Sequence, residues 1–442
     1  MKMLFLIATL FAVSACGPSS DSSNDVLPIN PPPPPPPPGG GTTVDVVTNS
    51  TWLAWQDGIG NTWQPLTGSS FDVSDAEGKF GIAYKCQTRE TGDTLITIHH
   101  MTIADYSSIG LPIPAYCDDP VVPSTIVVTP VNRQTGNSAL VAWGDIGAAG
   151  DLAAIVGVTD ISGSISCYGG DILGIEGAPL GGVAEAAPEV PSRYYIERDI
   201  ASCTDKSIDF AGPGAFPAAA VASITVVGGY TGISATFETM TRSRIQANTG
   251  NGTAFAGVPL AQQLNTDGHW IGVTDLVMAA GEITANMGYI GFKDPVSQTV
   301  TVPTGVAPTH SVSIAATTPY KMYTTDWSAY ADSYYSQPAG HSVIYGGLGS
   351  MPMWHASFTT AWLGGTYTYT LPDLSGVTGW DNAWGISAIQ LSLPILNSYA
   401  LPAGGSWADY TRNGFQYRGV FGNVFTDGVE YAVNTHTVLT LY

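Results

Sequence analysis

The two stretches Phe80–Cys86 (FGIAYKC) and Leu95–Ile103 (LITIHHMTI) decide the expected fold. Both are short and rich in β-branched and aromatic residues, which favours strands over helices. Similar runs recur along the chain between clusters of Gly, Pro, Asn and Asp, which are typical of turns. The clearest of them are Ile126–Val131, Leu140–Trp143, Ile224–Val227, Gly232–Glu238, Thr299–Val302, Thr366–Leu371, Ile389–Leu393 and Thr437–Leu441. The pattern predicts an all-β protein with several β-sandwich-like domains in tandem.

Composition agrees with a β protein. Of 442 residues, 44% are hydrophobic and 11% charged, and the chain holds 52 Gly and 31 Pro. So many Gly and Pro residues interrupt long helices, while the apolar content is ample for cores. Only Ala218–Ala222 and Pro259–Leu264 hint at helix. Asp57-Gly58 lies between two Trp-bearing segments and predicts a hairpin turn.

The net charge is −21, with 14 basic residues in the whole chain. These residues are spread thinly and form no patch or stripe, so we expect no nucleic-acid partner. Acidic charge also repels anionic lipid surfaces. Any membrane association is therefore expected to come from a covalent anchor alone.

An anchor is indicated at the N-terminus. The apolar stretch Met3–Val13 follows Lys2 and is too short to span a bilayer. Ser14-Ala15-Cys16 comes next, and this arrangement resembles the lipobox of bacterial lipoproteins. The resemblance implies that residues 1–15 are a signal peptide and that Cys16 is acylated. The alternative is an ordinary secretory signal in which Cys16 has no role.

Residues 16–43 are expected to form a tether behind the lipidated Cys. The prolines Pro31–Pro38 form a stiff extended spacer of roughly 25 Å, and the glycines Gly39–Gly41 follow as a swivel. An SH3-type ligand is the alternative for the proline run. Gly17 stands where an Asp marks inner-membrane retention in such lipoproteins. The resemblance therefore implies a bacterial cell envelope location, at the outer membrane.

Clusters of proline suggest domain boundaries in the remaining chain. Near Pro120–Pro130, Pro213–Pro217 and Pro303–Pro308 they divide it into domains at 44–121, 122–215, 216–308 and 309–442. The last two could also form one larger β unit.

A second resemblance concerns uncharacterised exported bacterial proteins. It rests on the segment that begins at Trp55-Gln56-Asp57-Gly58, on the β-rich stretch Thr125–Asp145, and on the stretch Tyr367–Trp380, which contains Leu371-Pro372-Asp373-Leu374-Ser375. The first continues through Trp63-Gln64-Pro65-Leu66, Phe71-Asp72-Val73, Gly78–Cys86 and Ala115-Tyr116-Cys117. The similarity implies shared architecture, and no activity comes with it.

Four cysteines remain after Cys16, an even number that predicts two disulfides in an exported chain. Sequential pairing of Cys86 with Cys117 and of Cys167 with Cys203 keeps each bridge inside one expected domain. The alternative is a four-thiolate zinc site, for which the Cys-x-x-Cys spacing is lacking.

Catalytic signatures are not found: the chain has no Gly-x-Ser-x-Gly, His-Glu-x-x-His, phosphate loop or dinucleotide fingerprint. His99 and His100 are adjacent, so on a strand they face opposite sides of the sheet. Asp57–Asn61 has a faint likeness to a calcium loop but lacks further carboxylates, and we interpret it as a hairpin turn. No metal or cofactor is expected.

Aromatic residues are the remaining candidates for a ligand site. Trp380 and Trp384 flank Asp381 and Asn382, an arrangement used in sugar sites. Trp327 and Tyr334 belong to a second aromatic cluster before a Gly-rich stretch. The alternative is that these rings fill β cores and sheet rims.

These observations favour a surface-anchored, non-catalytic lipoprotein that displays β modules for binding or structural interaction. Its partners are the membrane, through the acyl group, and either a glycan or another surface protein. One alternative is a glycan-binding protein that uses the C-terminal aromatics. The other is a hydrolase with a site assembled between domains, which convergent carboxylates with shifted pKa values would favour.

Overall fold

The structure is a computed structural model of the chain. It describes residues 41–441 apart from 88–92, 118–123, 145–153, 168–169, 229–232, 242–243, 251–252, 280–281, 306–307, 348–349, 387–390, 393, 414–424 and 439. Cys16 and the proline tether lie outside the described residues.

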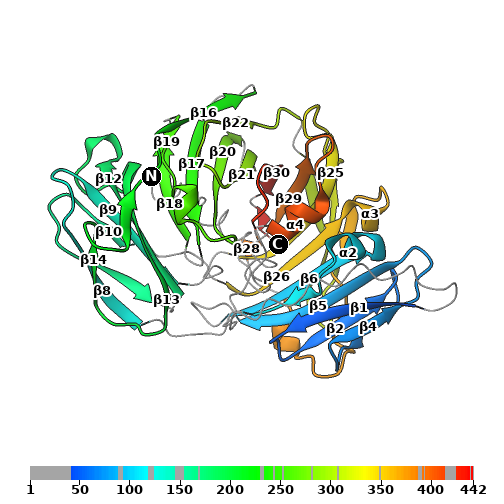
Figure 1. Cartoon of the computed structure of the whole chain (residues 1–442). Helices are drawn as coiled ribbons and strands as arrows, with labels where there is room; N and C mark the ends of the chain where they lie inside the picture. Colours follow the sequence, from blue (N-terminus) through cyan, green and yellow to red (C-terminus); the bar gives the residue numbers. More distant parts are fainter. Residues whose placement is uncertain are drawn as a thin grey trace.

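A 12-stranded sheet organises the molecule (Figure 1). Neighbouring strands are antiparallel except β26 and β6, which run parallel. In spatial order its strands are β18 (Arg244–Gly250), β17 (Ile233–Met240), β20 (Gly268–Ala279), β21 (Glu282–Phe292), β30 (Val429–Val438), β29 (Ile395–Leu401), β25 (Gln337–Gly347), β26 (Ser350–Thr359), β6 (Thr94–Thr102), β5 (Lys79–Gln87), β2 (Leu53–Asp57) and β3 (Gln64–Pro65).

Three smaller sheets pack on the long sheet. Each contributes alternate apolar side chains to a core shared with it. They are β4 (Ser70–Val73), β1 (Thr42–Thr48) and β7 (Ile113–Ala115); β19 (Ala254–Phe255), β16 (Ala222–Val227) and β22 (Gln298–Thr301); and β23 (His310–Ala316), β24 (Met322–Trp327) and β27 (Thr368–Thr370). A short pair, β28 (Leu391–Ser392) and β31 (Thr440–Leu441), completes this part.

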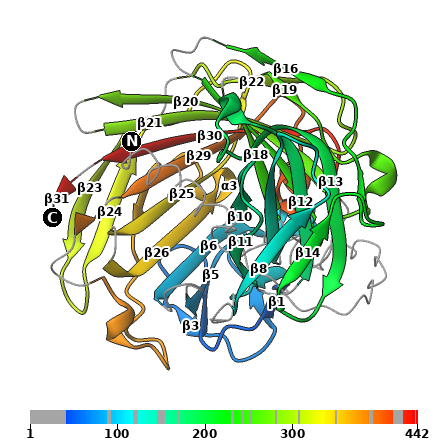
Figure 2. The ribbon, with the colours of Figure 1, turned by 90° about the vertical axis from the view of Figure 1, so that its left-hand side faces the viewer.

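Residues 124–217 form a further sandwich, seen beside the end of the long sheet in Figure 2. Its five-stranded sheet is β10 (Ala154–Val156), β9 (Ser138–Gly144), β12 (Gly170–Pro179), β13 (Pro188–Ile200) and β15 (Ala215–Pro217), and its three-stranded sheet is β11 (Gly163–Cys167), β8 (Ser124–Val131) and β14 (Lys206–Asp209). Arg198 on β13 lies 3.0 Å from Asp171 on β12 of the same sandwich. It also lies 2.6 Å from Asp267, the residue before β20, and this ion pair links the sandwich to the start of a long-sheet strand.

Helices are short. They are α2 (Ile103–Ile109), α3 (Thr360–Leu363) and α4 (Trp407–Asn413), with 3-10 turns η1 (Leu180–Gly182), η2 (Leu260–Gln262) and η3 (Asn382–Trp384). Helix α2 begins with a capping box, in which Thr102 accepts from the Asp105 backbone and the Asp105 carboxylate accepts from the Thr102 backbone. Among the described residues, no helix has both the length and the apolar character needed to cross a bilayer.

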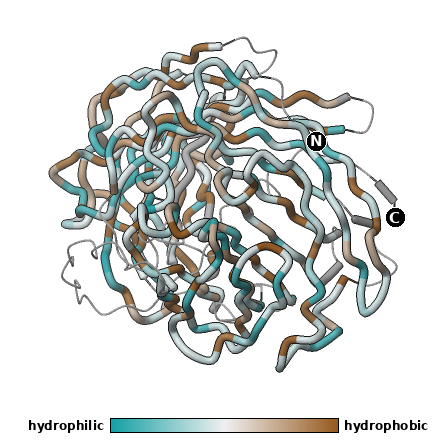
Figure 3. The backbone as a smooth tube through the Cα atoms, turned by 90° about the vertical axis from the view of Figure 1, so that its right-hand side faces the viewer, coloured by the Kyte–Doolittle hydropathy of each residue, from teal (hydrophilic) through white to brown (hydrophobic). Residues whose placement is uncertain are grey.

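The predicted all-β fold is confirmed, and every expected strand overlaps a strand of the structure. Some ends differ: Ile103 begins α2, and Val302, Thr366, Tyr367 and Leu371 lie just outside β22 and β27. Hydrophobic and hydrophilic residues are interspersed along the backbone (Figure 3). Pro259–Leu264 holds the single turn η2, whereas the expected helix at Ala218–Ala222 is wrong. Its only regular residue, Ala222, starts β16, because pairing with β19 and β22 outweighs the weak helix preference of a short alanine run.

The long sheet crosses the expected boundaries. It takes strands from the segments 44–121, 216–308 and 309–442, joined by the pairs β26–β6 and β21–β30. The boundaries near 121 and 308 therefore do not separate sheets. Segments 216–308 and 309–442 are joined by the antiparallel pairing of β21 with β30.

Candidate pocket between the 58–63 hairpin and the 372–377 segment

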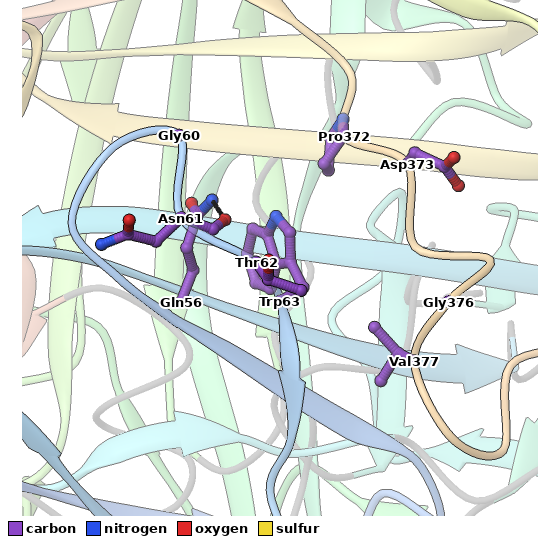
Figure 4. A pocket seen from close by; sticks show the side chains of 9 residues that line it. All are labelled: Gln56, Gly60, Asn61, Thr62, Trp63, Pro372, Asp373, Gly376 and Val377. Atoms are coloured by element: carbon purple, nitrogen blue, oxygen red, sulfur yellow. Dashed lines mark hydrogen bonds between the residues drawn. The ribbon is translucent and has the colours of Figure 1, made fainter.

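Two segments more than 300 positions apart in the sequence enclose a cavity of about 330 Å³ (Figure 4). One wall is the hairpin loop between β2 and β3, and the other is the segment 372–377 after β27. The lining residues are Gln56, Gly60, Asn61, Thr62, Trp63, Pro372, Asp373, Gly376 and Val377.

The hairpin wall is held by hydrogen bonds within its own neighbourhood. The Asp57 carboxylate accepts from the backbone N–H groups of Ser74 (3.0 Å) and Asp75 (2.9 Å). Gly58 has a φ of +78°, and a Cβ there would lie 2.6 Å from the Asp75 carboxylate, so the turn requires glycine. The predicted hairpin turn is confirmed, since β2 and β3 pair antiparallel across it.

This arrangement leaves the Asp57 carboxylate occupied by backbone donors. No group of three or more His, Cys, Asp or Glu side chains suited to a metal ion occurs among the residues that the structure describes. The hairpin interpretation of Asp57–Asn61 therefore accounts for its carboxylate without a cation.

The opposite wall is fixed by Tyr320. Its hydroxyl donates to the Pro372 carbonyl at 2.8 Å and accepts from the Leu374 backbone N–H at 2.7 Å. Burial raises the pKa of Tyr320 above its usual value, so the hydroxyl stays neutral and performs both roles. These two hydrogen bonds from a core residue fix the 372–377 segment, so this wall of the pocket is formed without a ligand.

The pocket mixes apolar and polar surface and carries a single charged group. Asp373 is its one carboxylate, and none of its nine lining residues is Lys or Arg. One oxygen of Asp373 accepts from the Ser375 backbone at 2.9 Å. Trp63, Pro372 and Val377 supply apolar walls. Uncharged hydrogen-bonding groups beside an aromatic ring are the usual make-up of a small-molecule site.

The predicted aromatics Trp380 and Trp384 lie in a half-buried tryptophan cluster. Their ring centroids are 5.4 Å apart, and both rings contact Trp52 edge to face, at 5.3 and 5.8 Å. The amino group of Lys85 lies 5.1 Å from the centre of the Trp384 ring. Edge-on packing of this kind fills a core rim and offers no flat stacking platform.

The other two predicted aromatics lie elsewhere. Trp327, the last residue of β24, is only 6% exposed and packs within the core, so its ring is not accessible to a ligand. Tyr334 is 43% exposed, and its hydroxyl donates to Glu430 at 2.8 Å. None of the four predicted aromatics lines the pocket.

Both predicted disulfides are present. Cys86 on β5 is bonded to Cys117, and Cys167 on β11 is bonded to Cys203. Each cysteine pair lies in or against a different apolar core: Cys86 and Cys117 in one, and Cys167 and Cys203 in the other. The thiols are consumed by these bonds, which excludes the four-thiolate zinc alternative.

The adjacent histidines face opposite sides of the sheet, as expected. His99 lies 2.7 Å from the Ser357 hydroxyl and 3.2 Å from that of Tyr84, whereas His100 packs 4.2 Å from the ring of Trp362. Burial, followed by a nearby imidazole (His355 for His99 and His99 for His100), lowers the pKa of both histidines to about 3. A base this weak cannot activate the Ser357 hydroxyl at neutral pH, so we assign the pair a structural role.

Comparisons with known proteins give no identity. No family model and no curated protein matches the chain. A solved structure of the chicken CNTN1 FN1–FN3 domains matches with 8% sequence identity, covering 60% of this chain and 84% of that one. Its TM-score of 0.15 is too low to indicate a shared fold.

Proposed function

We propose that this protein is a lipid-anchored bacterial envelope protein that binds a small ligand without transforming it. The lipobox at Cys16 and the proline tether support export and attachment. The acidic composition leaves the acyl chains as the means of membrane association. The two disulfides fit an oxidising compartment outside the cytoplasm.

One observation carries the binding role, namely the cavity of about 330 Å³ between the hairpin loop and the 372–377 segment. Its size lies at the lower end of the range for small-molecule sites. Each wall is fixed by its own hydrogen bonds, through Asp57 on one side and Tyr320 on the other. Such preorganisation reduces the entropic cost of binding.

The hydrolase alternative receives no support from this pocket. Glycoside hydrolysis commonly uses a pair of carboxyl groups flanking the reacting bond. The pocket offers only Asp373. We therefore assign it binding and derive no reaction from it.

Gly376 provides the test. A Cβ at this position would meet nothing within 4 Å, and its backbone lies outside the left-handed region, so Gly376→Phe adds a large ring at the pocket wall without backbone strain. Gly68 shares these two properties outside the pocket, and Gly68→Phe is the matched control. Binding of neutral sugars, spermidine and inorganic phosphate would be followed by saturation-transfer NMR or titration calorimetry.

We expect at least one of these probes to bind wild type and Gly68→Phe equally, and to be lost in Gly376→Phe. Matched melting temperatures would show that both variants are folded. The proposal is wrong if no probe binds in a way that depends on Gly376.

A further inference from the structure

The pocket contains two uncharged polar groups that lack a partner. Gln56 and Trp63 are each only 7% exposed, and both line the cavity. The Gln56 amide nitrogen donates to the Asn61 carbonyl. The Gln56 side-chain oxygen and the Trp63 indole N–H have no hydrogen-bond partner among the described residues, and neither atom is sealed in the core.

These two groups come from adjoining parts of one hairpin. In Figure 4 the Trp63 ring stands between the hairpin loop and the 372–377 segment, with Gln56 beside it. The Trp63 ring also packs edge to face against the His100 ring, with 5.9 Å between the ring centroids. One hairpin therefore contributes both a hydrogen-bond acceptor and a hydrogen-bond donor to the residues that line the cavity.

We propose that the ligand of this pocket is a neutral saccharide, whose hydroxyl groups pair with the Gln56 oxygen and the Trp63 N–H. This inference rests on the proposed function of the pocket. A hydroxyl donates and accepts at once, so it satisfies both groups. Both atoms reach solvent in the pocket, and a ligand that displaces their water without pairing with them loses affinity, which makes this pairing a source of specificity.

Charged ligands fit less well. An ammonium only donates, so it cannot satisfy the indole N–H, and a phosphate oxygen that only accepts cannot satisfy Gln56. An anion would also meet Asp373 with no Lys or Arg among the lining residues. The Asp373 oxygen that is not bonded to Ser375 is instead available to a further sugar hydroxyl.

The apolar walls suit the carbon face of a sugar ring. The Trp63 ring and the Val377 side chain both line the cavity, and neither carries charge. A ring with hydroxyls at its rim and C–H groups on its face matches this mixture of apolar wall and uncharged polar groups. The cavity of about 330 Å³ is suited to a single small ring.

The test removes the indole N–H. Trp63→Phe keeps an aromatic wall but deletes the donor, and Trp327→Phe makes the same change in a tryptophan that is equally buried (6% exposed) outside the pocket. Glucose, galactose and N-acetylglucosamine would be titrated by NMR, with spermidine and phosphate as the charged probes. We expect a sugar to bind, with Trp63→Phe weakening it about three- to tenfold, the value of one neutral hydrogen bond. Trp327→Phe should leave sugar binding unchanged.

Several outcomes would overturn the inference. If only spermidine or phosphate binds and Gly376→Phe abolishes that binding, the ligand class is wrong while the proposed function stands. If no probe depends on Gly376, both fail. Equal sugar affinity in wild type and Trp63→Phe would refute the role of the indole N–H. Should Trp63→Phe not fold, Gly376→Phe with each probe still decides the ligand class.

Discussion

The Nδ1 atoms of His310 and His436 lie 2.8 Å apart, and this contact joins the edge strand β23 of a small sheet to β30 of the long sheet. One Nδ1 must donate and the other accept, so the two rings cannot both carry a proton at this contact. Burial, followed by the neighbouring His436, lowers the pKa of His310 to about 4. On its other side, His436 lies 3.4 Å from the Glu282 carboxylate.

Stability should therefore fall in acid. Unfolded His310 titrates near 6.5 and folded His310 near 4, so the unfolded state binds more protons between these values. The favourable contribution is complete above pH 6.5 and declines as pH falls towards 4. His269, His341 and His355, whose pKa values burial also lowers to about 4, add to the same window.

Urea denaturation at pH 7 and pH 4.5 would measure this effect. We expect wild type to lose more unfolding free energy on acidification than His310→Gln, which removes one titrating imidazole and keeps a hydrogen-bonding side chain. An identical loss in both proteins would show that the pair does not contribute.

Replacing Cys16 should release the protein from membranes. Cys16→Ser removes the acylation site, and the acidic surface offers no other attraction to anionic lipid. Cell fractionation with a high-salt wash would test this, with wild type as the reference. Persistent membrane association of the variant would contradict the anchor.

Each disulfide should stabilise its own core. The bonds close loops with sequence separations of 31 and 36. In the chain-entropy model a loop of this length contributes about 3 to 4 kcal/mol. Replacing Cys86 and Cys117 by Ala should raise hydrogen exchange in β1, β5 and β7 and spare β8, β11 and β14, whereas the Cys167/Cys203 variant should do the reverse. Uniform loosening in either variant would argue against separate cores.

We expect the half-buried tryptophan cluster to contribute to the stability of the folded protein, although it lies in a Gly-rich segment. Trp380 is half-buried against Trp52, Tyr320 and Trp354, at 5.3 to 5.7 Å between ring centroids. We expect Trp380→Ala to cost about 1 to 3 kcal/mol and Trp354→Ala, fully buried, about 3 to 5 kcal/mol. Thermal melts would rank them. A negligible effect of Trp380→Ala would mean that its ring is available to a ligand after all.

Local sequence patterns determined much of this protein. Alternating β-branched and aromatic residues between turn residues predicted the strands, because side chains alternate across a sheet with a period of two. Asp57-Gly58 predicted its hairpin, since glycine permits the positive φ that the turn requires. An even cysteine count, in a chain that we expect to be exported, predicted the two disulfides. The start of helix α2 could also have been predicted from the sequence, since the Thr102–Asp105 capping box is a local signal.

Only the tertiary structure decided which distant segments meet. The parallel pairing of β6 with β26 brings residues some 260 positions apart side by side, and no local pattern specifies that partner. This pairing unites the 44–121 and 309–442 segments in one sheet, and the pocket lies between loops contributed by these two segments. Whether Trp63 lines a cavity while Trp327 fills a core likewise depends on what packs against each ring. Strand formation follows from a residue and its neighbours, whereas a pocket follows from long-range packing.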